Sequence, residues 1–248
     1  MQKTDPAVPS LAIVLAVLNE AETLAARLDA LAALRERGAR VIVVDGGSGD
    51  DSLAIAREHV ETTLSAPRGR ASQMNAGAAA CNADLLLFLH ADTVLPPNAD
   101  TLIRTALATD RPWGRFDVRI DSPRRLLATV AGAMNLRSRL TGIATGDQAM
   151  FMRRSAFESV GGFPPIALME DIAMSRHLKK LSRPACLTET VLTSARRWEK
   201  HGAWRTIWLM WRLRAAFFFG ADPTRLAWRY GYAPPEPSAC ADPNRETP

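Results

Sequence analysis

Lysine is scarce in this sequence. Only four of its 31 basic residues are lysine, and the formal net charge is +5. Arginine suits phosphate and pyrophosphate, because its planar guanidinium donates two parallel hydrogen bonds. The sequence also lacks zinc-finger spacing, an RNP-like aromatic motif and a lysine-rich tail, so no nucleic-acid partner is expected. An anionic small ligand or an anionic membrane surface fits the charge at least as well.

Cysteine and long hydrophobic runs are also rare. The three cysteines lie far apart, with no CxxC pair and no histidine at metal-ligand spacing, so neither a disulfide framework nor a zinc site is indicated. Residues 1–10 form a polar, proline-containing extension, and the apolar run after it is too short for a signal sequence or a membrane span. We therefore expect a cytoplasmic protein.

Along the sequence, apolar residues alternate between the spacing typical of strands and the spacing typical of helices. Apolar runs typical of buried strands alternate with segments of helical spacing, which predicts an α/β fold with a Rossmann-like, mainly parallel sheet flanked by helices. The predicted strands are 11–17, 41–45, 62–65, 85–90 and 113–120. The predicted helices are 20–36, one ending near 60, 70–81, 98–108, 124–140, 169–181 and 202–219.

This pattern divides the chain into segments. Residues 11–95 form a nucleotide-binding half built from four strands, and the mixed pattern of 96–198 predicts an acceptor-binding half. An amphipathic helical segment follows over 199–233. The proline-rich, polar tail 234–248 is expected to be disordered.

Two polar motifs follow predicted strands. Asp45 opens the sequence DGGSGD, and His90 and Asp92 belong to the sequence HADT. Ligands of parallel α/β sheets bind beyond the carboxyl ends of the strands, and a carboxylate there can hold a divalent cation on a diphosphate. We expect Asp45 and Asp92 to end adjacent strands. The structural alternatives are a tight turn with a helix cap after Asp45, a cap at Asp92 and a core position for His90.

A third motif, Glu170-Asp171, begins a predicted helix, where carboxylates are often only structural because the helix dipole stabilises them. The three motifs stand in a fixed order with several others. The order is Asn19-Glu20, then Asp45 with Ser48 and Asp50, Arg70 with Asn75 and Gly77, Asp92, GGFP, and finally Glu170-Asp171.

This order and spacing resembles glycosyltransferase family 2, a group of nucleotide-sugar transferases with the GT-A fold, over roughly residues 11–198. The stretches RGRASQMNAGA, HADT, GDQAMF and MEDIAMSRHL are similar to a bacterial subgroup, the radical-SAM and selenodomain-associated glycosyltransferases. The resemblance implies an inverting, metal-dependent enzyme that transfers a sugar from a nucleoside diphosphate-sugar of the UDP type. The acceptor would be a small molecule or a lipid-linked molecule.

The resemblance also implies residue roles. Asp45 would bind the base, Asp92 would hold Mg²⁺ or Mn²⁺ on the diphosphate, and Asp171 would be the general base, with Glu170 beside it. His90 stands where the family's DxD motif has its first carboxylate, so it is a second candidate metal ligand. The other candidates for nucleotide-sugar binding are Val17, Asn19, Glu20, Gly46, Ser48, Arg70, Asn75, His90 and Ala91. Candidates for contact with the diphosphate or acceptor are Asp147, Gln148, Arg196, Arg197 and Trp198, and the arginines there and at position 70 would neutralise the leaving diphosphate.

The sequence departs from the family at three places. His90 replaces a carboxylate, and Gly46 replaces the second of two paired aspartates after strand 41–45. Processive members carry QxxRW, whereas this chain has the sequence SARRW over 194–198. The glutamine is missing, so synthesis of long polymers is not expected.

The segment 202–219 has an aromatic face. This face contains Trp204, Trp208, Trp211, Ala215 and Phe218, and Arg205, Arg212 and Arg214 flank it. Such a helix can lie at a membrane surface with its arginines at anionic lipid, which would place the protein on the inner face of the membrane. The alternative is packing on the catalytic domain or on a second subunit of a homo-oligomer. Arginines interrupt the apolar stretch, so it does not span a bilayer.

Two other functions compete with sugar transfer. A nucleotidyltransferase acting on a sugar phosphate usually has a glycine-rich, basic loop directly after its first strand, and this chain has LNEAET there. A non-catalytic nucleotide-sugar binding protein is suggested by His90, but Asp92 and Glu170-Asp171 are retained and argue against it.

Overall fold

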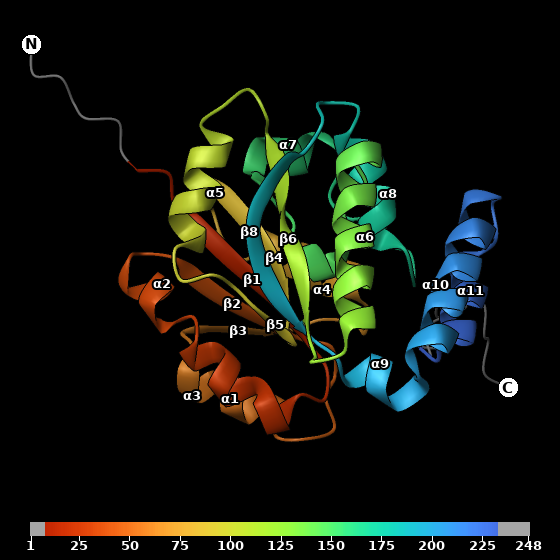
Figure 1. Cartoon of the computed structure of the whole chain (residues 1–248). Helices are drawn as coiled ribbons and strands as arrows, with labels where there is room; N and C mark the ends of the chain where they lie inside the picture. The colour runs from red at the N-terminus through yellow and green to blue at the C-terminus, as the bar shows by residue number, and fades with distance from the viewer. Residues whose placement is uncertain (1–7, 233–248) are drawn as a thin grey trace, which may run out of the picture.

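The computed structural model describes residues 8–232 (Figure 1). The predicted disordered tail and residues 1–7 of the predicted extension lie outside this range. Within residues 8–232, eight strands form a single sheet in the order β3-β2-β1-β4-β7-β6-β8-β5. The strands are β1 (Leu11–Val17), β2 (Arg40–Asp45), β3 (Thr62–Ser65), β4 (Leu85–His90), β5 (Thr93–Val94), β6 (Trp113–Asp121), β7 (Phe151–Arg153) and β8 (Ala185–Ser194).

The sheet is mainly parallel. Strands β1 to β4 run in one direction, and β6 and β8 are parallel to each other, while β7 is antiparallel to both β4 and β6, and β5 is antiparallel to β8. Together with the flanking helices, this arrangement confirms the predicted α/β fold. The expectation that Asp45 and Asp92 end adjacent strands is wrong, because β1 lies between β2 and β4 and pairs with both.

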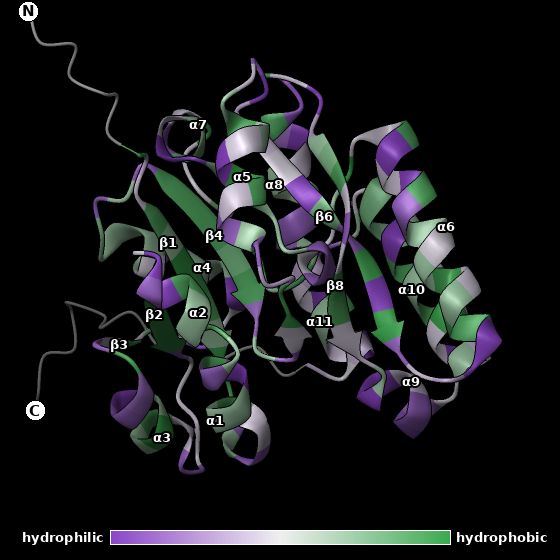
Figure 2. Ribbon diagram, turned by 60° about the vertical axis from the view of Figure 1, so that its left-hand side comes forward, coloured by the Kyte–Doolittle hydropathy of each residue, from purple (hydrophilic) through white to green (hydrophobic). Residues whose placement is uncertain are grey.

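Helices cover both faces of the sheet. They are α1 (Ala21–Asp29), α2 (Ala32–Glu36), α3 (Ser52–His59), α4 (Arg70–Ala79), α5 (Ala99–Leu107), α6 (Arg125–Thr141), η1 (Gly146–Gln148), α7 (Arg154–Ser159), α8 (Glu170–Leu178), α9 (Arg196–His201), α10 (Ala203–Phe218) and α11 (Pro223–Tyr230). Successive strand residues point to opposite faces, so each apolar strand serves two cores. Leu11, Ile13 and Leu15 pack with α1, α2, α3, α5 and α6, whereas Ala12 and Val14 pack with α4, α7 and α8. Strands β1 and β4 are hydrophobic along most of their length (Figure 2).

Several features differ from the predicted elements. A turn at residues 30–31 divides the predicted helix 20–36 into α1 and α2. In this turn Leu31 N–H donates to Leu28 O at 3.0 Å, and Leu31 and Leu34 remain buried. Strands β5, β7 and β8 were not predicted. β8 lacks a clear apolar alternation, and its pairing with β6 depends on residues about 70 positions away.

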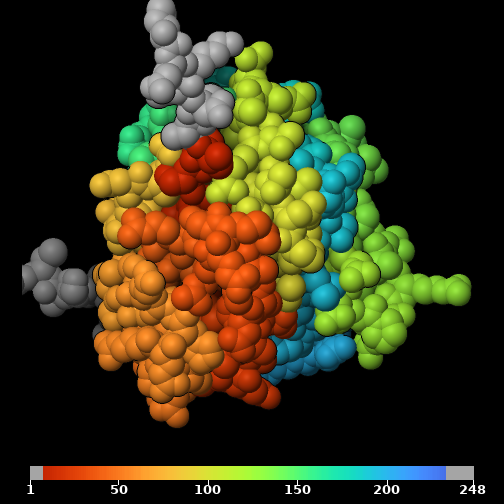
Figure 3. Space-filling view, turned by 90° about the vertical axis from the view of Figure 1, so that its left-hand side faces the viewer, coloured from red at the N-terminus to blue at the C-terminus, as the bar shows by residue number. Residues whose placement is uncertain are grey.

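The first third of the chain and helix α5 form adjoining surfaces (Figure 3). Arg37, which follows α2, donates to Asp100 of α5 at 2.8 Å and to the carbonyl oxygen of Pro97 at 2.6 Å. Asp100 is buried and also accepts from Arg104. These contacts join the two predicted halves on one side of the sheet.

Helices α10 and α11 lie side by side at one edge of the molecule (Figure 1). Their apolar residues Leu213, Leu226 and Ala227 pack against Leu168 and Ile172. The aromatic face of α10 is not covered: Trp204, Trp208 and Trp211 are 73%, 63% and 74% exposed. Within residues 8–232, no helix is long and apolar enough to cross a bilayer.

Candidate active site

The loops that follow β1 and β2 are tied together at the carboxyl ends of these strands. Asn19 donates its N–H to Ser48 Oγ at 2.9 Å and accepts from Gly49 N–H at 2.8 Å. Asp45 is buried and accepts from the backbone N–H groups of Gly47 and Ser48 and from the Ser48 hydroxyl. Asp45 therefore shapes its own loop, and its side chain does not line the neighbouring cavity.

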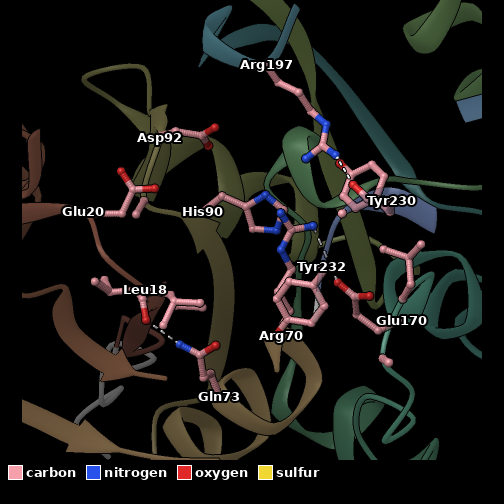
Figure 4. Close-up of a pocket in the computed structure, with 16 residues that line it drawn as sticks. Leu18, Glu20, Arg70, Gln73, His90, Asp92, Glu170, Arg197, Tyr230 and Tyr232 are labelled. Atoms are coloured by element: carbon pink, nitrogen blue, oxygen red, sulfur yellow. Dashed lines mark hydrogen bonds and ion pairs between the residues drawn. The ribbon is translucent and has the colours of Figure 1, made fainter. Parts of the chain in front are cut away.

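That cavity has a volume of about 240 Å³ and lies beyond the ends of β1 and β4 (Figure 4). Asp92, His90 and Glu20 face it from the sheet, Arg70 and Gln73 from α4, and Glu170 from the start of α8. Its lining comprises Ala16, Val17, Leu18, Glu20, Arg70, Gln73, His90, Ala91, Asp92, Ala167, Leu168, Glu170, Arg197, Tyr230, Gly231 and Tyr232. Of the predicted site residues, the structure thus brings together those at positions 17, 20, 70, 90, 91, 92, 170 and 197.

A second cavity adjoins the first. Arg70, His90, Leu168, Glu170 and Tyr230 line both. The second cavity adds Thr145, Gly146, Asp147, Met169, Asp171, Ile172, Met210 and Arg214. Asp92 and Asp171 therefore lie on different parts of one continuous polar surface, with Glu170 between the two cavities.

His90 faces the turn that contains Gly146 and Asp147. Its Nδ1 is 3.5 Å from Asp147 Oδ1. A Cβ atom at Gly146 would lie 2.1 Å from the imidazole Cε1, so only glycine allows the ring to pack there. Desolvation opposes ionisation of Asp147, but the hydrogen bond and charge of His90, together with Arg70 and Arg214, hold the pKa of Asp147 below its usual range.

Asp92 is the carboxylate that remains available at the end of β4. It is partly exposed, and Thr93 Oγ1 donates to it at 3.3 Å. Among residues 8–232, no three histidine, cysteine or acidic side chains are clustered as a metal would require. A single carboxylate still suits Mg²⁺ or Mn²⁺ that arrives with a diphosphate, since such ions keep waters and take phosphate oxygens as ligands.

Glu170 and Asp171 begin α8 after Met169, which has a left-handed backbone with φ of 71°. Asp171 accepts from Gly146 N–H at 2.8 Å and from Ile172 N–H at 2.7 Å. Glu170 is buried, with Arg70 Nη1 at 4.0 Å. Burial and, after it, the Asp171 carboxylate raise the pKa of Glu170 to about 6, while Arg70 opposes the shift. The left-handed backbone of Met169 is strained because this residue is not glycine, and such strain is typical of functional sites.

The arginines predicted near the diphosphate have different partners. Arg196 donates to Glu20 Oε2 at 2.7 Å and does not line the cavity. Arg197 lines the cavity, donates to Tyr230 O at 2.7 Å and places its guanidinium carbon 3.4 Å from the centre of the Tyr230 ring. Trp198 packs against the core.

Two predicted binding residues, Asn75 and Gln148, use their side chains to hold neighbouring segments of the chain. The Asn75 side chain donates to Phe163 O at 2.8 Å and accepts from Phe163 N–H at 2.9 Å, so it holds the GGFP loop. Gln148 is buried and bonds to Thr145 and Asn135. Neither side chain lines the two cavities.

Several cavity residues were missed from the sequence. Gln73 is buried and donates to Val17 O at 2.8 Å and Val44 O at 2.7 Å, which joins the ends of β1 and β2. A polar residue on the inner face of α4 was the available signal. Tyr230 and Tyr232, the chain's two tyrosines, close the cavity from the end of α11. The sequence shows that tyrosine is rare in this chain, but the position of the two tyrosines depends on how α10 and α11 pack.

Residues 12–161, more than half of the chain, match glycosyl transferase family 2. The chain belongs to this family. It is 31% identical over 170 residues to a PGL/p-HBAD biosynthesis glycosyltransferase of Mycobacterium bovis, a match that covers 63% of this chain and 64% of that protein. It is 25% identical over 179 residues to a poly-beta-1,6-N-acetyl-D-glucosamine synthase of Staphylococcus aureus, covering 65% of this chain and 43% of the synthase. The chain thus spans about 64% of the length of the mycobacterial relative.

Solved structures share the fold. Staphylococcus aureus TarS in complex with UDP-GlcNAc has a TM-score of 0.62 at 15% identity, covering 75% of this chain and 58% of that one. The mannosyltransferase PcManGT of Pyrobaculum calidifontis, in complex with GDP-Man and Mn²⁺, has a TM-score of 0.60 at 20% identity, covering 90% and 69%. Glucosyl-3-phosphoglycerate synthase of Mycobacterium tuberculosis, in complex with Mn²⁺, UDP and phosphoglyceric acid, has a TM-score of 0.56 at 19% identity, covering 73% and 68%.

Proposed function

We propose that this protein is an inverting glycosyltransferase that uses a nucleoside diphosphate-sugar of the UDP type and a divalent cation. The observation that carries the proposal is the continuous polar surface from Asp92 to Asp171, with Glu170 and Arg70 between them. It offers a carboxylate for a cation on the donor diphosphate and, separately, a carboxylate for the acceptor. Membership of glycosyl transferase family 2 supports the same reaction class.

The chemistry requires proton removal from a weak nucleophile. The acceptor hydroxyl oxygen forms a bond to the anomeric carbon while the bond from that carbon to the diphosphate oxygen breaks. The diphosphate leaves with the electron pair, and Asp171 takes the hydroxyl proton. A single displacement of this kind inverts the anomeric configuration. Arg70 and Arg197 lie on the donor side, where negative charge grows as the diphosphate departs.

A divalent cation would be held by Asp92 and by the donor's phosphates, and would supply positive charge at the leaving group. His90 is the weaker candidate ligand, because its Nδ1 already faces Asp147. Two of the structural neighbours described above contain Mn²⁺. The nucleotide differs among those neighbours, so comparison of UDP with GDP is part of the test below.

The exposed aromatic face of α10 supports a second proposal, contact with a membrane surface. Trp204, Trp208 and Trp211 are solvent-exposed, and the segment 200–232 contains six arginine or lysine residues and one acidic residue, Asp222. We propose that this face binds anionic lipid, with the rings at the headgroup level and the basic residues at the phosphates. A lipid-linked acceptor could then reach the active site without a membrane-spanning anchor.

Binding of UDP tests the proposed donor site. We expect Mg²⁺ or Mn²⁺ to strengthen UDP binding by the wild-type protein, and Asp92→Ala to weaken metal-dependent binding roughly tenfold or more, since a charged ligand contact is lost. Calorimetry with UDP and GDP, with and without metal, measures this. Asp110→Ala, in an exposed turn, is the matched control.

An Asp92→Ala variant with unchanged metal-dependent UDP affinity would remove this assignment. If the metal-loaded protein binds UDP-sugars but neither hydrolyses nor transfers them, the non-catalytic binding function is favoured instead.

A further inference from the structure

Two arginines stand at the Asp171 side of the site without the partners that buried guanidinium groups usually have. Arg137 comes from α6 and Arg214 from α10. Among residues 8–232, no group accepts a hydrogen bond from Arg137 Nε, Arg137 Nη2 or Arg214 Nε, although all three atoms are shielded from solvent. Buried donors without acceptors cost free energy, so they are uncommon unless a ligand completes them.

Other arginines of the same region have several acceptors. Arg115 is buried, but it donates to Ser138 Oγ at 3.1 Å, to the Asp117 carboxylate and to Asn135 O. Arg139, two residues after Arg137 on α6, donates to Asp117 at 2.6 Å. The open donors of Arg137 and Arg214 therefore do not reflect a general shortage of acceptors around α6.

Electrostatics agree with this contrast. Burial and, after it, the positive charges of Arg214 and Arg115 lower the pKa of Arg137 to about 10, while Asp171 and Asp147 oppose the shift. The two guanidinium groups thus repel each other, and because both residues are only partly exposed, solvent screens this repulsion only in part. An anion between them would relieve the repulsion and accept the open N–H groups.

The location of the pair indicates which substrate carries the anion. Arg214 lines the second cavity together with Asp171 and Asp147, whereas Asp92 and Arg197 line the first. The donor diphosphate is assigned to the first cavity. Arg214 therefore stands on the acceptor's side of the proposed catalytic base, and Arg137 lies near enough for the charges of Arg214 and Asp171 to act on it.

We propose that Arg137 and Arg214 bind a phosphate monoester carried by the acceptor. The inference rests on the proposed glycosyl transfer and adds to it the class of acceptor. A phosphate monoester offers several acceptor oxygens and up to two negative charges, which suit three open donors on two guanidinium groups. It could belong to a soluble phosphorylated molecule or to a lipid phosphate presented where α10 meets the membrane.

Inorganic phosphate is the simplest probe. The protein is first saturated with UDP and Mg²⁺ to fill the donor side, and thermal stability is then measured as phosphate is added, since binding to the folded state raises the melting temperature. We expect phosphate to stabilise the wild-type protein, and Arg137→Gln and Arg214→Gln to weaken phosphate binding roughly tenfold or more. Arg57→Gln, exposed on α3, is the charge-matched control.

The ligand-free proteins provide a fold control. Removal of either charge relieves repulsion, so both variants should melt at or above the wild-type temperature, whereas a structural arginine would leave a less stable protein. Phosphate stabilisation that is absent in the wild type, or equal in all four proteins, overturns the inference.

Two further arms separate the sources of the phosphate. Glycerol 3-phosphate represents a soluble acceptor, and vesicles with phosphatidic acid, compared with phosphatidylglycerol vesicles of equal surface charge, represent a lipid phosphate. Binding of glycerol 3-phosphate, or a preference for phosphatidic acid vesicles, supports the proposed site if it is lost in both Arg137→Gln and Arg214→Gln. The phosphate response is also measured in Asp92→Ala. A variant that keeps both the phosphate response and the wild-type metal-dependent affinity for UDP would refute only the donor assignment. Metal-dependent UDP binding by the wild-type protein with no phosphate response would refute only this inference.

Discussion

At the scale of single residues, Glu170 shows how burial and charge act on one carboxyl group. Its pKa is about 6 in the folded protein, against an ordinary value of 4.5. At a pH below the ordinary pKa, the Glu170 carboxyl group is protonated in both the folded and the unfolded chain. As the pH rises through the two pKa values, the carboxyl group ionises more readily in the unfolded chain. The free energy of unfolding therefore falls by about 2 kcal/mol.

Glu170→Gln should remove that fall, because glutamine does not titrate. Chemical denaturation at pH 4.5 and pH 7.5 measures the difference, and Glu61→Gln, exposed before β3, is the control. We expect the loss of stability between the two pH values to be about 2 kcal/mol smaller in Glu170→Gln than in the wild type and the control. An equal loss in all three proteins would show that Glu170 has an ordinary pKa.

The sequence predicted residues whose role depends on position along a strand. Asp92 and His90 end a long apolar run, and the carboxyl end of such a strand lies at the site in a parallel sheet. The contacts of those residues could not be predicted in this way. That His90 faces Asp147, and that Asn75 holds a loop near Phe163, depends on segments 57 and 88 positions away.

At the scale of elements, the apolar strands and amphipathic helices were predictable because their periodicity is local. The strand-to-helix order through β4 follows directly from it, apart from the division of the predicted helix 20–36 into α1 and α2. β8 was not predicted, since its sequence ACLTETVLTS has exposed residues at its centre and is stabilised by pairing with β6. The last helix, α11, was also missed as a separate element, and it carries Tyr230 into the site.

Helix α10 makes the membrane proposal testable. Anionic vesicles should retain the protein at low salt and release it as the Debye length falls from about 30 Å at 0.01 M to about 8 Å at 0.15 M salt. The double variant Trp208→Ala/Trp211→Ala should lose retention, because the rings supply the apolar contact. Vesicle sedimentation measures both effects.

Leu181→Ala removes an exposed apolar side chain at another place and serves as the control. It should be retained as the wild type is. If the wild-type protein is not retained at any salt concentration, the aromatic face instead binds a protein surface, such as a second copy of this chain.

At the scale of the whole molecule, the site is assembled from distant parts of the chain. The first cavity takes Val17 from β1 and Tyr232 from the residues after α11, so it includes residues near both ends of the described range. Within residues 8–232, three residues other than glycine have left-handed backbones, namely Asn19, Ala149 and Met169. Met169 lines the second cavity, and Asn19 directly follows Leu18, which lines the first. Such strain persists only where the surrounding fold fixes it, which suits a site that must hold two substrates in register.

The proposed mechanism depends above all on Asp171 as the catalytic base, and conversion of this residue to asparagine is its sharpest test. The variant keeps the shape of the side chain and can still accept one of the two backbone hydrogen bonds, from Gly146 or Ile172. We therefore expect a stability loss of only about 1 kcal/mol and unchanged nucleotide-sugar binding. Loss of the base should lower transfer by ~10²–10⁴-fold.

The decisive measurement is the rate of sugar transfer per folded molecule of Asp171→Asn, with the folded fraction and donor affinity determined on the same sample. We predict that folded, donor-binding Asp171→Asn transfers sugar at least about a hundredfold more slowly than the wild type. A destabilised variant, by about 2 kcal/mol, that transfers sugar at the wild-type rate per folded molecule would instead show that Asp171 only stabilises the start of α8.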